Sequence, residues 1–307
     1  MTAPGDNGIA GGYLVGSMWW YAAYVLRPAQ ALRRAGLSPT RTEGDLPHEP
    51  PRSGLGPYFS RRHREPVLLS KKTRHDDLVE EFDRMSEVYA EFVQPFSQPI
   101  FDEALTVIRN YLPGDARVLD AGCGPGRELM RIARLVPRGE VVGVDLAAGM
   151  VRTAHRAARA AGLSNCAFLQ ADVGELPAAF SGKFDLVYNC LAHHHYPEPA
   201  TAASSVLRCL RPGGVYCVVD PGPAWYNALS APIAKWADPG WIGFHTPEGF
   251  RDLFLTAGFS RAGWFELLPG FGVAVGQKST ARPSGAGVKV DRGAKARRRV
   301  EPQSSGR

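Results

Sequence analysis

The central part of this chain alternates short apolar runs with segments whose apolar residues recur at helical spacing. The expected strands are Arg117–Ala121, Val141–Asp145, Cys166–Gln170, Phe184–Asn189 and Val215–Asp220. The expected helices between them are Glu128–Leu135, Gly149–Ala161, Gly174–Phe180 and Ala200–Leu210. Such alternation is typical of βαβ units, in which helices cover both faces of a parallel sheet.

Helices are also expected before the first strand. Apolar residues at helical spacing mark the first of them: Leu78, Phe82, Met85, Tyr89 and Phe92. A second helix is predicted over 99–112, where Pro113 and Gly114 end it.

The carboxyl-terminal part adds one helix over 246–258 and then two apolar runs. Pro269 and Gly270 separate these runs, so we expect them to pair as an antiparallel hairpin at one edge of the sheet. The predicted fold class is therefore α/β, with a Rossmann-like and mostly parallel sheet.

The amino-terminal segment has a different character, because Gly8–Leu26 carries no charged residue. A helix of that length would measure about 28 Å, close to the thickness of bilayer hydrocarbon. Its glycines lower helix propensity, and the Met18–Tyr21 cluster is more typical of a membrane interface than of a lipid core. A helix packed on the protein, attachment to a membrane surface and a true span remain as interpretations.

These patterns divide the 307 residues into four regions. Residues 1–38 form the apolar and aromatic segment, 39–75 a basic Pro-rich linker, 76–277 the main domain with its amino-terminal lid helices, and 278–307 a basic, disordered tail.

Charge and cysteine content add limits on partners and location. The net charge of +6 arises in the flanks, because the main domain itself contains more acidic than basic residues. A basic pI usually indicates a protein that binds nucleic acid, but the acidic main domain argues against nucleic acid as a partner. The five cysteines form no CxxC pair, so we expect reduced thiols in a cytoplasmic protein, with membrane-surface contact through the first segment as an option.

A glycine-rich turn follows the first expected strand in the sequence VLDAGCGPG, Val118–Gly126. Its Gly-x-Gly-x-Gly spacing places Arg127 where a dinucleotide fingerprint needs its third glycine. Asp120 precedes the turn and would repel a pyrophosphate, so it favours a ligand with ammonium or sulfonium charge. Asp145, which ends the second strand, suits ribose hydroxyls, and Asp172 follows the third strand within reach of an adenine.

Five blocks now share one order and spacing with a known family: VLDAGCGPG, VVGVDLAAGM, QADVGELP, FDLVYNCLAHHHYP and VLRCLRPGGVYCVVD. Residues 115–277 resemble the class I S-adenosylmethionine-dependent methyltransferases, in particular the small-molecule group of ubiquinone and menaquinone methyltransferases. The resemblance implies a seven-stranded sheet with an antiparallel last strand, and S-adenosylmethionine as the cofactor. It also implies a cofactor site formed by Asp120, Gly122, Cys123, Gly124, Gly126, Asp145, Leu146, Met150, Asp172, Val173 and Asn189.

The chain departs from relatives that methylate exocyclic amines, because Cys190 and Leu191 stand where those have two prolines. This departure argues against DNA and glutamine side chains as acceptors.

Three adjacent histidines follow the fourth strand, and neutral histidine is a common metal ligand. Adjacent side chains of an extended chain point in opposite directions, so we expect no metal site here. A histidine with a pKa near 6.5 can instead accept a substrate proton. The candidate bases are His193, His194, His195 and His245.

A strongly aromatic insertion follows the fifth strand. With the first helix it is predicted to cover an apolar substrate pocket, with contacts from Tyr89, Trp225, Tyr226, Trp236 and Trp241. The predicted function is methyl transfer to oxygen or carbon of a hydrophobic or aromatic small molecule. The alternatives are a cofactor-binding but non-catalytic regulatory protein, and an RNA or protein methyltransferase guided by the basic flanks; the oligomeric state is left open.

Overall fold

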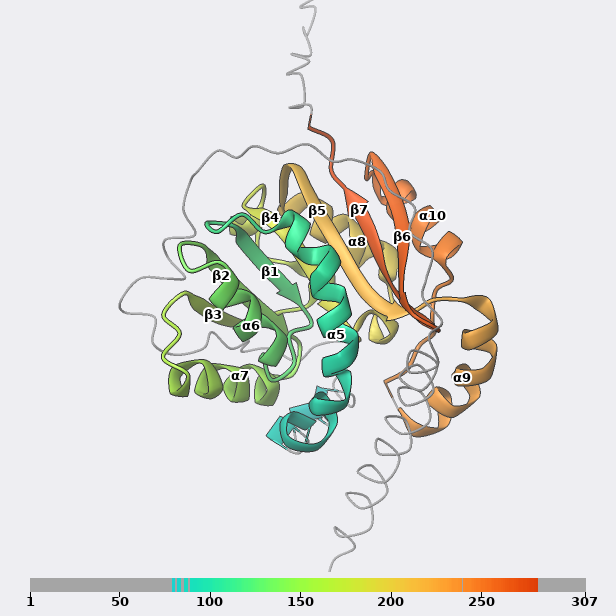
Figure 1. Ribbon diagram of the computed structural model, residues 1–307, viewed down its shortest axis with the longest axis horizontal. Helices are drawn as coiled ribbons and strands as arrows, with labels where there is room; N and C mark the ends of the chain where they lie inside the picture. The colour runs from blue at the N-terminus through green and yellow to red at the C-terminus, as the bar shows by residue number, and fades with distance from the viewer. Residues whose placement is uncertain (1–78, 81, 84–85, 88, 239, 281–307) are drawn as a thin grey trace, which may run out of the picture.

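The computed structural model describes residues 79–80, 82–83, 86–87, 89–238 and 240–280 (Figure 1). The predictions for the apolar amino-terminal segment, the linker and the part of the tail beyond residue 280 lie outside these ranges, as do Leu78 and Met85. No helix within the described ranges is long and apolar enough to cross a membrane.

Seven strands form one sheet: β1 (Arg117–Ala121), β2 (Glu140–Asp145), β3 (Cys166–Gln170), β4 (Phe184–Cys190), β5 (Leu210–Pro221), β6 (Arg261–Leu268) and β7 (Phe271–Gln277). Their order across the sheet is β3-β2-β1-β4-β5-β7-β6. Strands β1 to β5 pair in parallel, whereas β7 is antiparallel to both of its neighbours. The predicted fold class and the predicted hairpin at the sheet edge are confirmed.

The helices are α5 (Gln94–Ile108), α6 (Arg127–Leu135), α7 (Ala148–Ala160), α8 (Pro199–Cys209), α9 (Ala224–Ala237) and α10 (Pro247–Ala257). A π-helical turn, Tyr89–Val93, precedes α5 and a 3-10 turn, Arg109–Tyr111, follows it. Further 3-10 turns span Val173–Glu175, Ala178–Phe180 and His193–His195.

Two sequence predictions of elements were wrong in detail. The expected helix over 174–180 is two separate 3-10 turns, because Leu176 precedes a proline and takes an extended ψ of 145°. Strand β5 begins at Leu210 rather than Val215, and its pairing with β4 shifts between Phe184 and Leu186.

Apolar side chains project from both faces of the sheet, so the protein has two buried layers (Figure 1). Neighbouring residues in a strand point to opposite faces, and Val118 and Val141 accordingly pack in the layer beneath α5, α6 and α7. Leu119 and Val142 pack in the other layer, with α8 and α10.

The sheet order creates a crevice at its centre. The chain reaches the β3 edge and then returns to place β4 on the other side of β1. The chain leaves β1 towards α6 in one layer and leaves β4 towards α8 in the other layer, and ligands of open α/β sheets bind at such a point, at the carboxyl ends of the strands.

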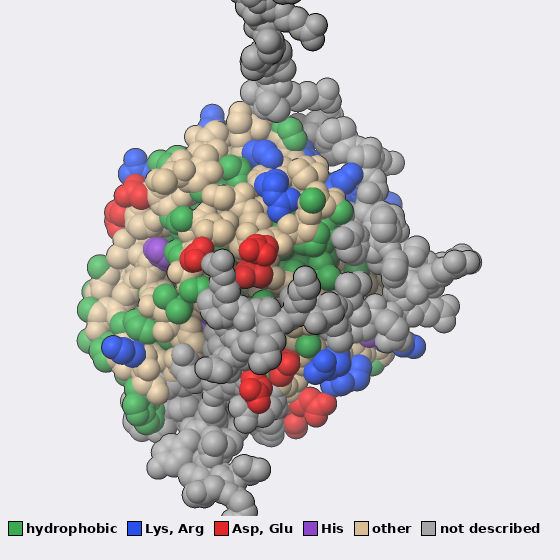
Figure 2. Space-filling model, turned by 180° about the vertical axis from the view of Figure 1, so that it is seen from behind, with side chains coloured by type: hydrophobic (Ala, Val, Ile, Leu, Met, Phe, Trp, Pro, Cys, Tyr) green, Lys and Arg blue, Asp and Glu red, His purple; other side chains and the backbone are tan. Residues whose placement is uncertain are grey.

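Charged side chains of both signs are interspersed on the face seen in Figure 2. Among the coloured residues of that view no extended basic surface is visible.

Candidate functional site

A cavity of about 580 Å³ opens at the carboxyl ends of β1 to β4. Its lining includes most of the predicted cofactor residues: Asp120, Gly122, Cys123, Gly124, Asp145, Leu146, Met150, Asp172 and Val173. Because these residues come from the carboxyl ends of β1 and β2 and from the segments that follow β1, β2 and β3, the fold itself brings them together.

The glycine-rich turn gives the cavity one of its walls. Gly124 has a φ of +49°, which L side chains rarely adopt, and an added Cβ would meet no atom of the described residues within 4 Å. Open space thus adjoins the backbone, as close approach of a ligand requires. At Gly122 an added Cβ would lie 2.9 Å from the Cβ of Ala192, so this glycine allows the loop after β4 to pack against the turn.

Asp145 connects this turn to the end of β2. Its Oδ2 accepts a hydrogen bond from the Gly124 N–H at 2.8 Å, and its Oδ1 accepts one from the Ala147 N–H at 2.9 Å. Burial raises the pKa of Asp145 to about 6, although these backbone donors oppose the shift. A carboxylate oxygen can accept more than one hydrogen bond, so both oxygens of Asp145 remain able to accept hydrogen bonds from hydroxyl groups of a ligand.

Two further carboxylates from the sequence prediction also lie at the cavity. Asp120 is 2% exposed and accepts a hydrogen bond from the Tyr188 hydroxyl at 2.5 Å. Burial raises its pKa well above the usual range, while the Tyr188 hydrogen bond lowers it. Asp172 caps the 3-10 turn after β3 by accepting a hydrogen bond from the Gly174 N–H at 2.7 Å.

Glu128 also lines the cavity, and the sequence prediction missed it. The side chains of Ser97 and Gln98 each donate a hydrogen bond to its Oε1 at 3.2 Å. An acidic residue in the first turn of a helix usually interacts favourably with the helix dipole. The presence of Glu128 at this position therefore did not by itself indicate a binding site.

Gly126 and Asn189 are predicted cofactor residues that do not line the cavity. Gly126 is close to Ala154 on α7, where an added Cβ would clash. Asn189 donates hydrogen bonds to the Ala121 carbonyl and to the Tyr196 hydroxyl. It therefore fixes the loop after β4 against β1 and supports the cavity from outside.

The three histidines form a 3-10 turn rather than an extended segment. The turn follows Leu191, whose φ of +54° is unusual for a residue other than glycine. Consecutive side chains of this turn do not alternate, and the rings of His194 and His195 lie 4.3 Å apart. The sequence prediction assumed an extended segment, in which these histidines would not converge. That assumption is wrong for His194 and His195.

His195 is the one of the four candidate bases that lines the cavity. Burial lowers its pKa, and the nearby Asp238 carboxylate opposes that shift. His194 is buried behind it, with its Nδ1 at 2.7 Å from Oδ1 of Asp220. Burial would lower the pKa of His194, but Asp220 and Asp238 together raise it.

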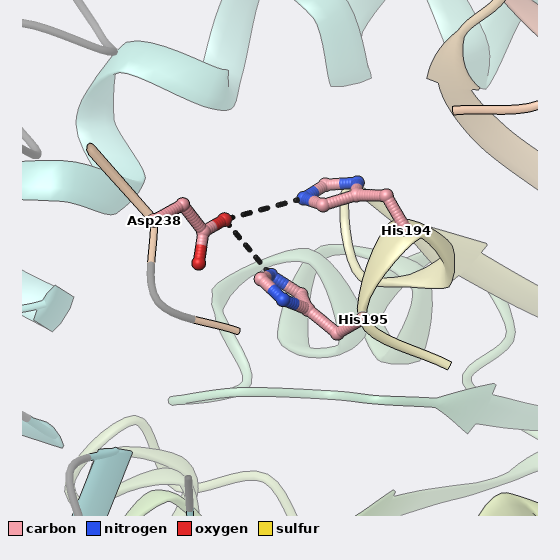
Figure 3. Close-up of side chains that lie close together, drawn as sticks. All are labelled: His194, His195 and Asp238. Carbon is pink, nitrogen blue, oxygen red and sulfur yellow. Dashed lines mark ion pairs between the residues drawn. The ribbon is translucent and has the colours of Figure 1, made fainter. Parts of the chain in front are cut away.

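Both of these histidines face Asp238, which follows α9 (Figure 3). Oδ2 of Asp238 lies 3.8 Å from Nε2 of His194 and 3.5 Å from Nε2 of His195. A residue far along the chain thereby meets the loop after β4.

His193 and His245 do not line the cavity. Their rings lie 5.3 Å apart and both contact Phe250 of α10. Burial lowers the pKa of each. Their surroundings indicate a packing role in the layer beneath α10.

The predicted substrate residues are divided by the structure. Tyr89 lines the cavity together with Val79 and Phe82. Trp225, Tyr226, Trp236 and Trp241 are not among the residues that line this cavity, so their contact with substrate stays a prediction.

The reason is the orientation of α9. Trp225 and Trp236 lie on its outer side and are 51% and 66% exposed. Tyr226 turns the other way and packs against Phe271 of β7. Trp241 contacts Phe244 in the segment that follows. An aromatic-rich sequence is compatible with either side of a helix, so only the packing shows which side faces the cavity.

Comparisons with known proteins agree with this geometry. A family model described as a methyltransferase domain matches residues 113–239. Trans-aconitate 2-methyltransferase of Deinococcus radiodurans is 32% identical over 190 residues, which cover 60% of this chain and 67% of that protein. Nocamycin O-methyltransferase of Saccharothrix syringae is 34% identical over 143 residues, which cover 46% of this chain and 50% of that protein.

Solved structures share the fold. A SAM dependent methyltransferase from Aquifex aeolicus superposes with a TM-score of 0.50 at 18% identity, over 65% of this chain and 97% of that one.

Proposed function

Because this chain belongs to the class I S-adenosylmethionine-dependent methyltransferases, we propose that it methylates oxygen or carbon of a hydrophobic or aromatic small molecule. S-adenosylmethionine is the cofactor of this protein, and the residues that line the cavity suit that ligand. The more specific likeness to ubiquinone and menaquinone methyltransferases stays a prediction.

The charges of the cavity fit this cofactor. When bound, S-adenosylmethionine supplies a methyl group already activated on a positively charged sulfur. Asp120, Glu128 and Asp145 all line the cavity, and carboxylates favour a cationic ligand. Open space beside Gly124 gives such a ligand access to the backbone.

One observation supports the proposal for the acceptor: the cavity that these carboxylates line is also lined by a group of apolar and aromatic side chains. Val79, Phe82, Tyr89 and His195 all line it, and the rings of Tyr89 and His195 lie 6.4 Å and 5.5 Å from the ring of Phe82; we call this group the aromatic end of the cavity. Apolar walls favour an apolar acceptor and exclude water from the reacting groups. The polar edge of His195 gives this end a group that orients an acceptor oxygen.

The relatives support a small acceptor in general terms. One is named for trans-aconitate and another for O-methylation of nocamycin. We infer the same class of reaction here, with the acceptor set by the residues around Tyr89 and His195.

The test is product identification with the full-length protein. Cofactor labelled in its methyl group is incubated with protein and cell extract, and the labelled products are separated by size and polarity. A labelled small apolar product is expected; label in RNA or protein alone would refute the proposal.

Two variants make the result specific. Asp145→Ala should strongly reduce labelling at a cofactor concentration below saturation, whereas Asp252→Ala, which changes an exposed acid on α10, should retain it. Cofactor binding by calorimetry with no labelled product under any condition would instead identify a cofactor-binding protein without transfer activity.

A further inference from the structure

We propose that His194, His195 and Asp238 form a binding site for a divalent transition-metal cation of the zinc type. One ligand atom from each residue lies within 4.8 Å of the other two (Figure 3). The two histidines come from the turn after β4, and Asp238 comes from the end of α9.

The separations approach those of a tetrahedral site. Zinc binds nitrogen and carboxylate oxygen at about 2.0–2.2 Å, which places neighbouring ligand atoms about 3.3–3.5 Å apart. Oδ2 of Asp238 lies 3.5 Å from Nε2 of His195 and 3.8 Å from Nε2 of His194. Small side-chain rotations would therefore bring the three atoms into a coordination shell.

The groups that bind these side chains on the side away from the proposed cation are also typical of a metal site. Histidine ligands usually bind a carboxylate or carbonyl through the ring nitrogen that does not face the metal. His194 does so through Nδ1, which lies 2.7 Å from Asp220, and both side chains are almost completely buried. Asp238 is held as well, because its Oδ1 accepts a hydrogen bond from the Gly240 N–H at 3.0 Å.

The donor set defines the class of cation. Two imidazole nitrogens and one carboxylate oxygen suit zinc, cobalt or iron, whereas magnesium and calcium prefer oxygen ligands alone. Three protein ligands leave at least one coordination position for water or another ligand. His195 also lines the large cavity, so the site adjoins the proposed acceptor end.

Cation binding at this cluster does not depend on the proposed methyl transfer, because it is measured without cofactor or acceptor. The full-length protein is dialysed against a chelator and titrated with zinc chloride in a calorimeter. Cobalt(II) is then added to a second sample, since its visible absorption reports a low-symmetry site with nitrogen ligands. One equivalent of each cation is expected at saturation, with displacement of cobalt by zinc.

Two single variants assign the binding to this cluster. Asp238→Asn preserves the shape of the ligand, and His195→Gln preserves polarity at a partly exposed position. Each should weaken zinc binding by at least about tenfold and change the cobalt spectrum. Asp220→Asn leaves all three ligands in place and should weaken binding by about 10- to 100-fold through the orientation of His194.

The matched control is His155→Gln on α7, which changes a histidine outside the cluster and should retain wild-type affinity. Circular dichroism and thermal unfolding confirm that each variant is folded. Absence of one-to-one binding by wild type would overturn the proposal, as would full affinity in the folded Asp238→Asn and His195→Gln variants. The second result would place the cation elsewhere, for example on the free cysteines.

Discussion

The cofactor affinity of this protein should depend on pH through the ionisation of Asp145. Burial raises the pKa of this carboxyl to about 6 in the free protein. Hydroxyl groups of a ribose donate to the ionised form, so binding favours the carboxylate. Affinity should therefore be full above this pKa and should fall as the pH decreases through it.

The magnitude follows from the ionised fraction. A group with a pKa of about 6 is about 90% ionised at pH 7 and about 10% ionised at pH 5. If binding needs the carboxylate, the Kd should rise by roughly tenfold over this interval, equivalent to about 1.4 kcal/mol. The α-amino and α-carboxyl groups of the ligand titrate mainly outside it.

Calorimetric titration of S-adenosylhomocysteine at pH 7, 6 and 5 measures this dependence. Asp83 and Asp120 lie near enough to interact with Asp145, so a comparison variant is needed to assign the effect. Asp145→Ala should bind at least about tenfold more weakly at pH 7, because it loses a charge-assisted hydrogen bond of about 1.5–3 kcal/mol. It should also show a flatter pH dependence.

A wild-type Kd that is constant between pH 7 and pH 5 would refute the reasoning. An unchanged pH dependence in Asp145→Ala would assign the titration to another group. Circular dichroism at each pH shows whether the protein stays folded.

Three further predictions test other parts of the site. Gly124→Ala and Gly162→Ala both place a side chain at positive φ in open space. Each variant should therefore have a free energy of unfolding about 1–2 kcal/mol lower than the wild type. Gly124→Ala alone should also weaken cofactor binding in calorimetry. Tyr188→Phe removes the hydroxyl that donates a hydrogen bond to the buried carboxyl of Asp120. Urea unfolding should show a free energy of unfolding lower by about 1–3 kcal/mol. Equal stability would mean that this carboxyl finds another donor. Tyr89→Ala should raise the KM for the acceptor and leave cofactor affinity nearly unchanged, because Tyr89 lines the apolar end of the cavity; the control Trp236→Ala changes an exposed side chain and should alter neither quantity.

Much of the cofactor side of this protein follows from sequence-local features. The glycine turn and the acids that end or follow β1, β2 and β3 occupy fixed places relative to their strands. Asp120, Asp145 and Asp172 could therefore be assigned before the fold was known, and all three line the cavity. Parallel strands bring their carboxyl ends to one edge, so correct strand assignment already implied that these residues converge.

The acceptor side could not be assigned in this way. The aromatic character of α9 is clear in the sequence, yet Trp225 and Trp236 lie outside and Tyr226 packs on the core. Nothing local distinguishes these cases, because the rotation of a helix about its axis depends on what it packs against.

The histidines show the same division in a single segment. The sequence determined that three imidazoles follow β4, at the ligand-binding edge of the sheet. The tertiary structure decided that a left-handed Leu191 leads into a 3-10 turn, which directs His195 to the cavity and His194 to Asp220. It also brought Asp238 to both rings across more than forty residues of chain. Local patterns determine where strands end, whereas contacts between distant segments depend on how whole layers pack, and no short stretch of sequence contains that information.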